Sequence, residues 1–108
     1  MKPDYKIYSM LGLATKAGRI VSGEFMTEKA VKSGSAWLVI VSEEASDNTK
    51  KMFTNMCRFY EVPLHIFGTK EELGNSMGKE FRASAAVTDP GFAKAIQEKL
   101  VNISNMEV

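Results

Sequence analysis

The chain has 108 residues, of which 44% are hydrophobic and 25% are charged. This length and composition predict a single domain over residues 1–108, with its core at about residues 4–100, and exclude a second domain. Because 14 basic residues nearly balance 13 acidic ones, the strong overall basic field of many nucleic-acid binders is excluded, and any such site must be a local patch. A lone cysteine, Cys57, and a lone histidine, His65, exclude an internal disulfide and a structural zinc site.

The first residues, Met1-Lys2-Pro3-Asp4-Tyr5, are charged where a secretory signal peptide has an apolar run. No later stretch approaches the roughly 20 apolar residues that are needed to span a membrane. We therefore expect a cytoplasmic protein without a membrane partner.

Apolar residues at helical spacing open the chain and predict an amphipathic helix over about residues 4–17. The short β-branched run Arg19-Ile20-Val21 favours a strand. Ser22-Gly23 then offers the cap of a second helix, which Gly34 ends. The continuous apolar run Leu38-Val39-Ile40-Val41 predicts a central strand, covered on both faces and parallel to a neighbour.

A third helix follows, with Ser46 as its cap, and runs to about Tyr60 before Pro63 closes it. Its expected buried stripe consists of Met52, Phe53, Met56 and either Phe59 or Tyr60. Residues 64–67 predict another strand.

The last part of the chain carries two further helix starts. Thr69 and Glu72 have the spacing of a capping box at the start of a short helix that reaches Met77. Residues 83–88 predict the last strand, and Asp89-Pro90 then pairs a cap residue with a proline at the first helical position. The expected inward face of this terminal helix is Phe92, Ala93, Ile96 and Leu100. The final few residues are expected to fray.

This order of elements, helix first and then strands alternating with helices, favours a three-layer α/β/α sandwich with about four strands in a mixed sheet. Ligands of open α/β domains usually bind where the turns at one end of the strands meet. Four segments are expected near that rim, namely residues 16–29, 43–50, 68–70 and 78–85.

Candidate catalytic groups are sparse. Glu43 and Glu44 follow a predicted strand and could hold magnesium, but no aspartate nucleophile lies near Phe67, so we interpret both as solvating a turn. Cys57 and His65 could form a nucleophilic pair, although a buried thiol and a strand histidine explain them more simply. The glycines lack the strand-then-loop order of a nucleotide cradle. The sequence therefore favours recognition over catalysis, without a cofactor.

Basic residues flank the start of the second helix, namely Lys16, Arg19, Lys29 and Lys32. A helix N-terminus exposes free backbone N–H groups and a positive dipole end, and Gly23 has no side chain to hold a phosphate away. Phe25 lies on the same helical stripe as Lys29 and Lys32. The pattern suits a nucleic acid, although basic helix faces are commonly only solvated.

The run of residues 23–40, GEFMTEKAVKSGSAWLVI, resembles the signature of the kink-turn-binding ribosomal-protein superfamily, Gly-x-Asn-Glu-x-x-Lys-Ala-x-x-x-Gly-x-Ala-x-Leu-Val. Six or more positions match without a gap, and the likeness covers about residues 11–100. Leu11-Gly-Leu-Ala14, Ser22-Gly23-Glu24 and Thr88-Asp89-x-Gly91-Phe92-Ala93 make the chain most similar to the bacterial YlxQ-type, ribosomal-protein-like members of that superfamily.

The resemblance implies binding to a sharply bent RNA duplex, with the ribosome as an expected partner. The helix that begins near Gly23 and Glu24 would enter the widened groove beside sheared G·A pairs, with Lys29 on phosphate or base edges. The residues aligned with the loop that covers an unstacked base are Arg82, Ala83, Ser84 and Ala85. Ser46 and Lys70 fall near other positions of that pocket. Such binding agrees with the reading of RNA through its shape and splayed bases.

The chain departs from the signature at the residues that hydrogen-bond the guanines. The family's asparagine and glutamate correspond to Phe25 and Met26, and each good base-edge pair that is lost costs roughly 1–3 kcal/mol. The next basic residue of the family is Ser33 here, which the neighbouring Lys32 partly compensates. Three alternatives stay open: Phe25 stacks on a base, worth roughly 1–3 kcal/mol, the target is another RNA shape, or Phe25 packs in the core.

A second function also stays open, a protein–protein adaptor on the same fold with no RNA ligand. Phe25 and Met26 would suit protein contact if they lie on an exposed helix face. Binding that strengthens as salt falls would favour RNA, because phosphate contacts release counterions.

Overall fold

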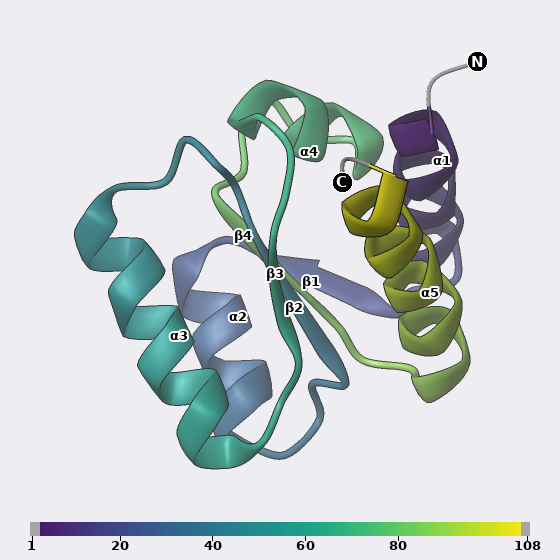
Figure 1. Cartoon of the computed structure of the whole chain (residues 1–108). Helices are drawn as coiled ribbons and strands as arrows, with labels where there is room; N and C mark the ends of the chain where they lie inside the picture. The colour runs from purple at the N-terminus through teal and green to yellow at the C-terminus, as the bar shows by residue number, and fades with distance from the viewer. Residues whose placement is uncertain (1–2, 107–108) are drawn as a thin grey trace.

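The computed structural model describes residues 3–106, which form a sheet between two layers of helices (Figure 1). In chain order the elements are α1 (Pro3–Lys16), β1 (Ile20–Ser22), α2 (Glu24–Lys32), β2 (Leu38–Val41), α3 (Asp47–Tyr60), β3 (Leu64–Ile66), α4 (Lys70–Ser76), β4 (Ser84–Val87) and α5 (Pro90–Met106). The expected α/β/α sandwich, with a helix first and four strands in a mixed sheet, is confirmed over these residues. Met1 and Lys2 of the charged N-terminus, and residues 107–108 of the end expected to fray, lie outside the described residues.

The sheet has the strand order β1-β4-β2-β3. β2 is parallel to β3, as the sequence predicts, and antiparallel to β4, while β1 is antiparallel to β4. The register pairs Val41 with Ser84 and Ser22 with Ala85. The last residues of β1, β2 and β3 therefore lie at the same edge as the first residue of β4. We call this edge the Gly23 edge, and the opposite one, where the Trp37 amide donates to the Val87 carbonyl, the Trp37 edge.

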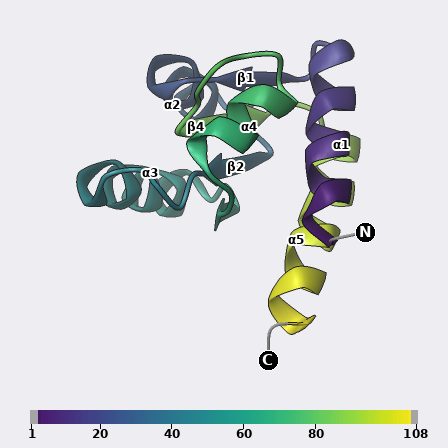
Figure 2. The ribbon, with the colours of Figure 1, turned by 90° about the horizontal axis from the view of Figure 1, so that it is seen from above.

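Each face of the sheet is covered by its own set of helices, α1, α4 and α5 on one side and α2 and α3 on the other (Figure 2). Successive residues of β2 alternate between the two resulting cores, with Leu38 and Ile40 in the first and Val39 and Val41 in the second. All four side chains are fully buried. This double coverage explains why β2 is an uninterrupted apolar run.

Three of the predicted helix caps are confirmed by side-chain hydrogen bonds. Ser46 Oγ accepts from the Thr49 amide at 3.1 Å, Thr69 Oγ1 accepts from the Glu72 amide at 3.0 Å, and Asp89 Oδ2 accepts from the Phe92 amide at 2.9 Å. Each bond satisfies one of the amide groups that a helix start leaves free.

The expected buried stripe of α3 is only partly right. Phe53 is fully buried and Met52 and Met56 pack at the edge of its core, but Phe59 is 78% exposed and Tyr60 is exposed as well. The inward position in the last turn is taken by Cys57. The helix ends at Tyr60, as expected, and its C-cap residue Glu61 adopts the left-handed conformation at φ 58°. The rings of Phe59 and Tyr60 pack edge to face, with their centroids 4.9 Å apart.

Among residues 3–106, no helix combines the length and the apolar character that crossing a bilayer requires.

Candidate functional site

Four loops meet at the Gly23 edge and are joined by backbone hydrogen bonds. The Gly23 amide donates to the Ser84 carbonyl at 2.9 Å, and the Ser42 amide donates to the Ala83 carbonyl at 2.8 Å. The Glu43 amide and the Ser42 hydroxyl both donate to the Gly68 carbonyl, at 2.9 Å each. Parts of all four segments expected at this rim are therefore held side by side, with Gly23 as the contact from residues 16–29.

Glu44 has a structural role that the sequence does not indicate. We interpreted it as solvating a turn, but its Oε1 accepts from the Lys70 amide at 2.8 Å. Lys70 is the first residue of α4, so this carboxylate satisfies a free amide at a helix start. The bond joins the β2–α3 loop to the start of α4.

Arg82 connects three of the loops. Its Nε donates to Ser22 Oγ at 2.9 Å, its amide donates to the Lys70 carbonyl at 3.0 Å, and its Nη1 donates to the Phe81 carbonyl at 2.7 Å. The expectation that Ser22 helps to cap α2 is therefore wrong, because Ser22 is the last residue of β1 and its hydroxyl accepts from Arg82. A guanidinium has five N–H donors, so Arg82 keeps donors for a ligand.

Gly74 allows the α4–β4 loop to lie directly against α4. A Cβ atom at this position would come within 2.8 Å of the carbonyl carbon and oxygen of Glu80 and within 2.9 Å of Phe81 Cα. These are backbone atoms, which cannot rotate away. The absence of a side chain at Gly74 thus sets the position of the loop that carries Phe81 and Arg82.

The start of α2 is open. Gly23 is the N-cap residue, at φ 92° and ψ 159°, and no side chain caps the helix. The first turn thus leaves amide groups without a side-chain partner beside the positive dipole end, an arrangement that favours an anion. Glu24 lies in this turn and opposes that field.

The side chains that follow on α2 point to solvent. Phe25 is 75% exposed, Met26 is 41% exposed, and Lys29 is exposed without an ion pair among the described residues. The alternative in which Phe25 packs in the core is therefore wrong. The buried face of the helix is made by Thr27, Ala30 and Val31 instead.

Lys32 is held by its own helix. Its Nζ lies 2.9 Å from Glu28 Oε2, one turn earlier, and this hydrogen bond together with the charge of Glu28 raises the pKa of Lys32. Lys32 is also the last residue of α2, at the end of the helix away from Gly23. It is less available to a ligand at the Gly23 edge than Lys29.

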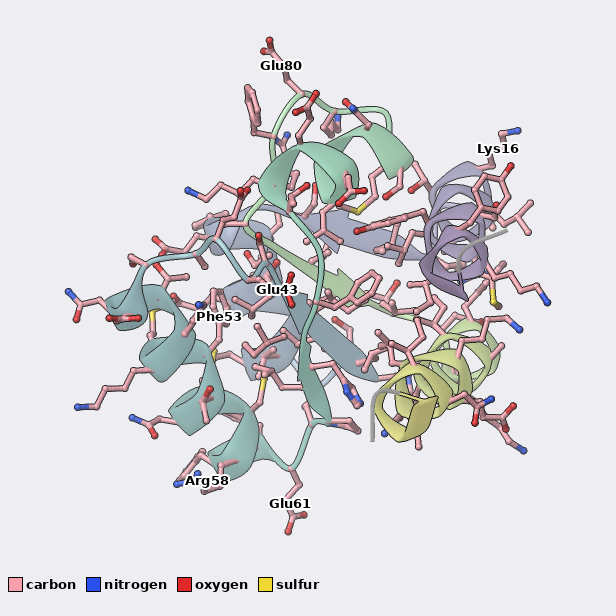
Figure 3. All side chains as sticks on the ribbon, turned by 45° about the horizontal axis from the view of Figure 1, so that its top comes forward. Lys16, Glu43, Phe53, Arg58, Glu61 and Glu80 are labelled. Atoms are coloured by element: carbon pink, nitrogen blue, oxygen red, sulfur yellow. The ribbon has the colours of Figure 1, made fainter. Side chains whose placement is uncertain are left out.

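Lys16 and Arg19 lie apart from the other candidates. Arg19 precedes β1, and its carbonyl accepts from the Thr88 amide, which places it at the Trp37 edge. Figure 3 shows Lys16 on α1, well away from Glu43 at the end of β2. The expectation that residues 16–19 join the rim is wrong, because β1 carries the chain across the sheet between Arg19 and Gly23.

The four residues that the resemblance places over an unstacked base, Arg82, Ala83, Ser84 and Ala85, differ in solvent exposure. Arg82 and Ala83 are partly exposed, whereas the side chains of Ser84 and Ala85 are buried and can offer little to a ligand. Phe81, which no sequence motif singles out, is 56% exposed beside Arg82. The sequence feature that could point to Phe81 as a contact residue is the presence of an aromatic side chain in a polar loop. Ser46 and Lys70 both begin helices at this edge.

The candidate nucleophile has no support from the structure. Cys57 is buried, and desolvation raises the pKa of its thiol to about 11, so it is protonated at neutral pH. Burial also lowers the pKa of His65. Among the described residues, no group of three or more histidine, cysteine, aspartate or glutamate side chains could hold a metal ion.

Residues 5–97 match the family described as ribosomal protein L7Ae/L30e/S12e/Gadd45. The chain belongs to this family. It is 43% identical over 89 residues to the RNA-binding protein YlxQ of Bacillus subtilis (strain 168), which covers 82% of this chain and 89% of that protein. It is 34% identical over 93 residues to the RNA-binding protein YlxQ of Enterococcus faecium, covering 86% and 89%. The resemblance to YlxQ-type members is thus confirmed.

Solved structures agree with the L7Ae-type fold. A Bacillus halodurans protein of unknown function superposes with a TM-score of 0.85 at 36% identity, over 87% of this chain and 95% of that one. A 15.5 kD RNA-binding protein of Giardia lamblia has the same fold, with a TM-score of 0.79 at 18% identity, over 97% and 90% of the two chains.

Replacing Gly74→Ala should disturb the α4–β4 loop by driving a methyl group into the Glu80 backbone. We expect the free energy of unfolding to fall by about 1–3 kcal/mol, measured by urea denaturation. Asn75→Ala, at an exposed position of the same helix, is the matched control and should change it by less than about 0.5 kcal/mol. Equal effects of the two substitutions would contradict the packing assigned to Gly74.

Proposed function

We propose that this L7Ae-family chain is a non-enzymatic RNA-binding protein that takes a kink-turn, or a similarly bent RNA, at the Gly23 edge. The observation that carries the proposal is the uncapped start of α2, followed by an exposed Phe25 and an unpaired Lys29. The names of the two YlxQ relatives, at 43% and 34% identity, support RNA as the ligand. We further propose a cytoplasmic protein that meets its RNA on the ribosome.

Charge at this edge is close to balanced. The basic residues there are Lys29, Lys70 and Arg82, and the acidic ones are Glu24, Glu43 and Glu44. Of these, Glu44 accepts a hydrogen bond from the Lys70 amide. Counterion release from phosphates can therefore supply only part of the affinity. Much of the remaining RNA affinity then comes from the free amides of α2 and from stacking.

Two exposed rings support stacking. Phe25 follows the start of α2, and Phe81 belongs to the loop that Arg82 joins to Ser22. Aromatic side chains stack on unpaired bases at roughly 1–3 kcal/mol per base, whichever base it is. In this proposal Phe25 replaces base-edge hydrogen bonds with stacking, and Phe81 with Arg82 covers a splayed base.

Replacing Lys29→Ala should weaken binding to a kink-turn oligonucleotide by about 1–2 kcal/mol, because one charge-assisted contact is lost. The melting temperature should stay nearly unchanged, since the side chain is exposed and has no ion pair among the described residues. Titration by fluorescence anisotropy measures the affinity. Lys16→Ala, which removes the same charge at the other edge, is the control. An equal loss of affinity in both variants would show that only overall charge matters.

The double variant Phe25→Asn with Met26→Glu restores the hydrogen-bonding residues of the family signature. We expect it to bind a standard kink-turn more tightly, and to bind a bent RNA without sheared G·A pairs less tightly, than the unchanged chain. Parallel titrations of the two RNAs measure the switch. If neither affinity changes, the start of α2 is not the RNA contact and the proposed site is wrong.

A further inference from the structure

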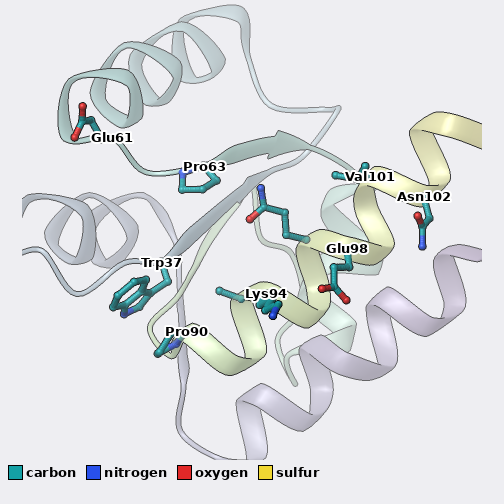
Figure 4. A pocket seen from close by; sticks show the side chains of 10 residues that line it. Trp37, Glu61, Pro63, Pro90, Lys94, Glu98, Val101 and Asn102 are labelled. Carbon is teal, nitrogen blue, oxygen red and sulfur yellow. The ribbon is translucent and has the colours of Figure 1, made fainter.

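A groove of about 830 Å³ lies at the Trp37 edge, on the opposite side of the sheet's strands from the Gly23 edge. It runs along α5, with Trp37 and Pro90 at one end and Val101 and Asn102 at the other (Figure 4). Pro63, which precedes β3, forms its other side. β3 is an edge strand, so no further strand closes the groove on that side among the described residues.

The lining of the groove has the apolar and aromatic character of an interface. Trp37 is 53% exposed, and Pro63, Pro90 and Val101 are exposed as well. A second hollow of about 200 Å³ shares Trp37 and Pro63 with the groove, so the indole borders both. Exposed apolar surface of this kind, together with an exposed tryptophan, is typical of protein contact sites.

The charged residues of the lining are free to meet a partner. Glu61 and Glu98 are exposed, and neither has an ion pair among the described residues. Lys94 is the one cation of the lining, so two carboxylates stand against one ammonium and the formal charge is −1. The excess of one carboxylate favours a cationic partner over an anionic one.

An arginine side chain fits this combination better than any other. Its guanidinium stacks on the face of an indole and pairs with a carboxylate through two N–H donors. Trp37 and Glu61 line both hollows, and Glu98 lines the groove further along α5. One cation beside Trp37 and another beside Glu98 would match the lining.

The length of the groove limits the occupant. The lining residues of α5 run from Pro90 to Asn102, which is roughly 18 Å of helix at 1.5 Å per residue. An extended chain covers that distance with about five residues at 3.3 Å each.

We propose that the groove binds an extended segment of a partner protein, about five residues long, in which arginines alternate with apolar side chains. One arginine stacks on Trp37 and pairs with Glu61, the other pairs with Glu98, and the apolar side chains contact Pro63, Pro90 and Val101. The groove and the Gly23 edge are separated by the length of the strands, roughly 13 Å for the four residues of β2. The two sites therefore share no residue, so the partner and the RNA do not compete for the same contacts.

Trp37 is the only tryptophan of the chain, so its fluorescence reports occupancy of the groove directly. The probe is a capped pentapeptide, Leu-Arg-Leu-Arg-Leu, titrated into the full chain. Its control carries citrulline, which has the same shape without the charge, in place of both arginines. We expect a saturable change in Trp37 emission with the arginine peptide and a much weaker one with the citrulline peptide.

The double variant Glu61→Gln with Glu98→Gln should weaken binding of the arginine peptide roughly five-fold, because two ion pairs are lost. Glu71→Gln with Glu80→Gln removes the same charge from the α4 region and should leave the affinity unchanged. Equal binding of the two peptides would overturn the proposal, and so would the absence of any change in Trp37 emission. A change in Trp37 emission that depends on protein concentration in the absence of peptide would overturn it as well. A response of Trp37 to kink-turn RNA would also overturn it.

Discussion

The candidate RNA site depends on the hydrogen bonds that fix four loops to one another at the Gly23 edge. Because β4 is antiparallel to both of its neighbours, its first residue lies beside the last residues of β1 and β2. Backbone donors of Gly23 and Ser42 then use the carbonyls of Ser84 and Ala83. The start of α2 and the α4–β4 loop are thereby placed together although about sixty residues separate them in sequence. Neither could form a site alone.

The chain is nearly neutral overall, but the groups that a ligand would meet differ between the two edges of the sheet. The Gly23 edge offers open amides, two exposed rings and an unpaired lysine, whereas the Trp37 edge offers an exposed indole and a groove lined by two carboxylates and one ammonium. In this account the excess carboxylate of the groove favours a basic protein segment there, whereas open amides, stacking rings and Lys29 together favour RNA at the Gly23 edge. A protein with both sites would connect a folded RNA to a partner without competition between them.

Local physics made most of the fold predictable from the sequence. The apolar run of β2 and the caps Ser46, Thr69 and Asp89 are set by neighbouring residues, so the sequence predicts all of them correctly. The misplaced residues depend on distant partners instead. The sequence around Ser22 predicts a cap because its true partner, Arg82, is 60 residues away. It predicts Lys16 and Arg19 beside Gly23 because a three-residue strand leaves little signal in the sequence. The roles given to Lys29, Lys70 and Arg82 in RNA binding stay predictions.

Nuclear magnetic resonance mapping of backbone amides during titration with a kink-turn RNA tests the account most directly, because it reports every edge of the molecule at once. We expect the amides of residues 23–29 and 79–83 to shift together and saturate at one RNA concentration, with smaller shifts at 43–46 and 68–70. The amides around Trp37 and along α5 should stay unchanged. Shifts centred on that opposite edge, or none at the start of α2, would contradict the account.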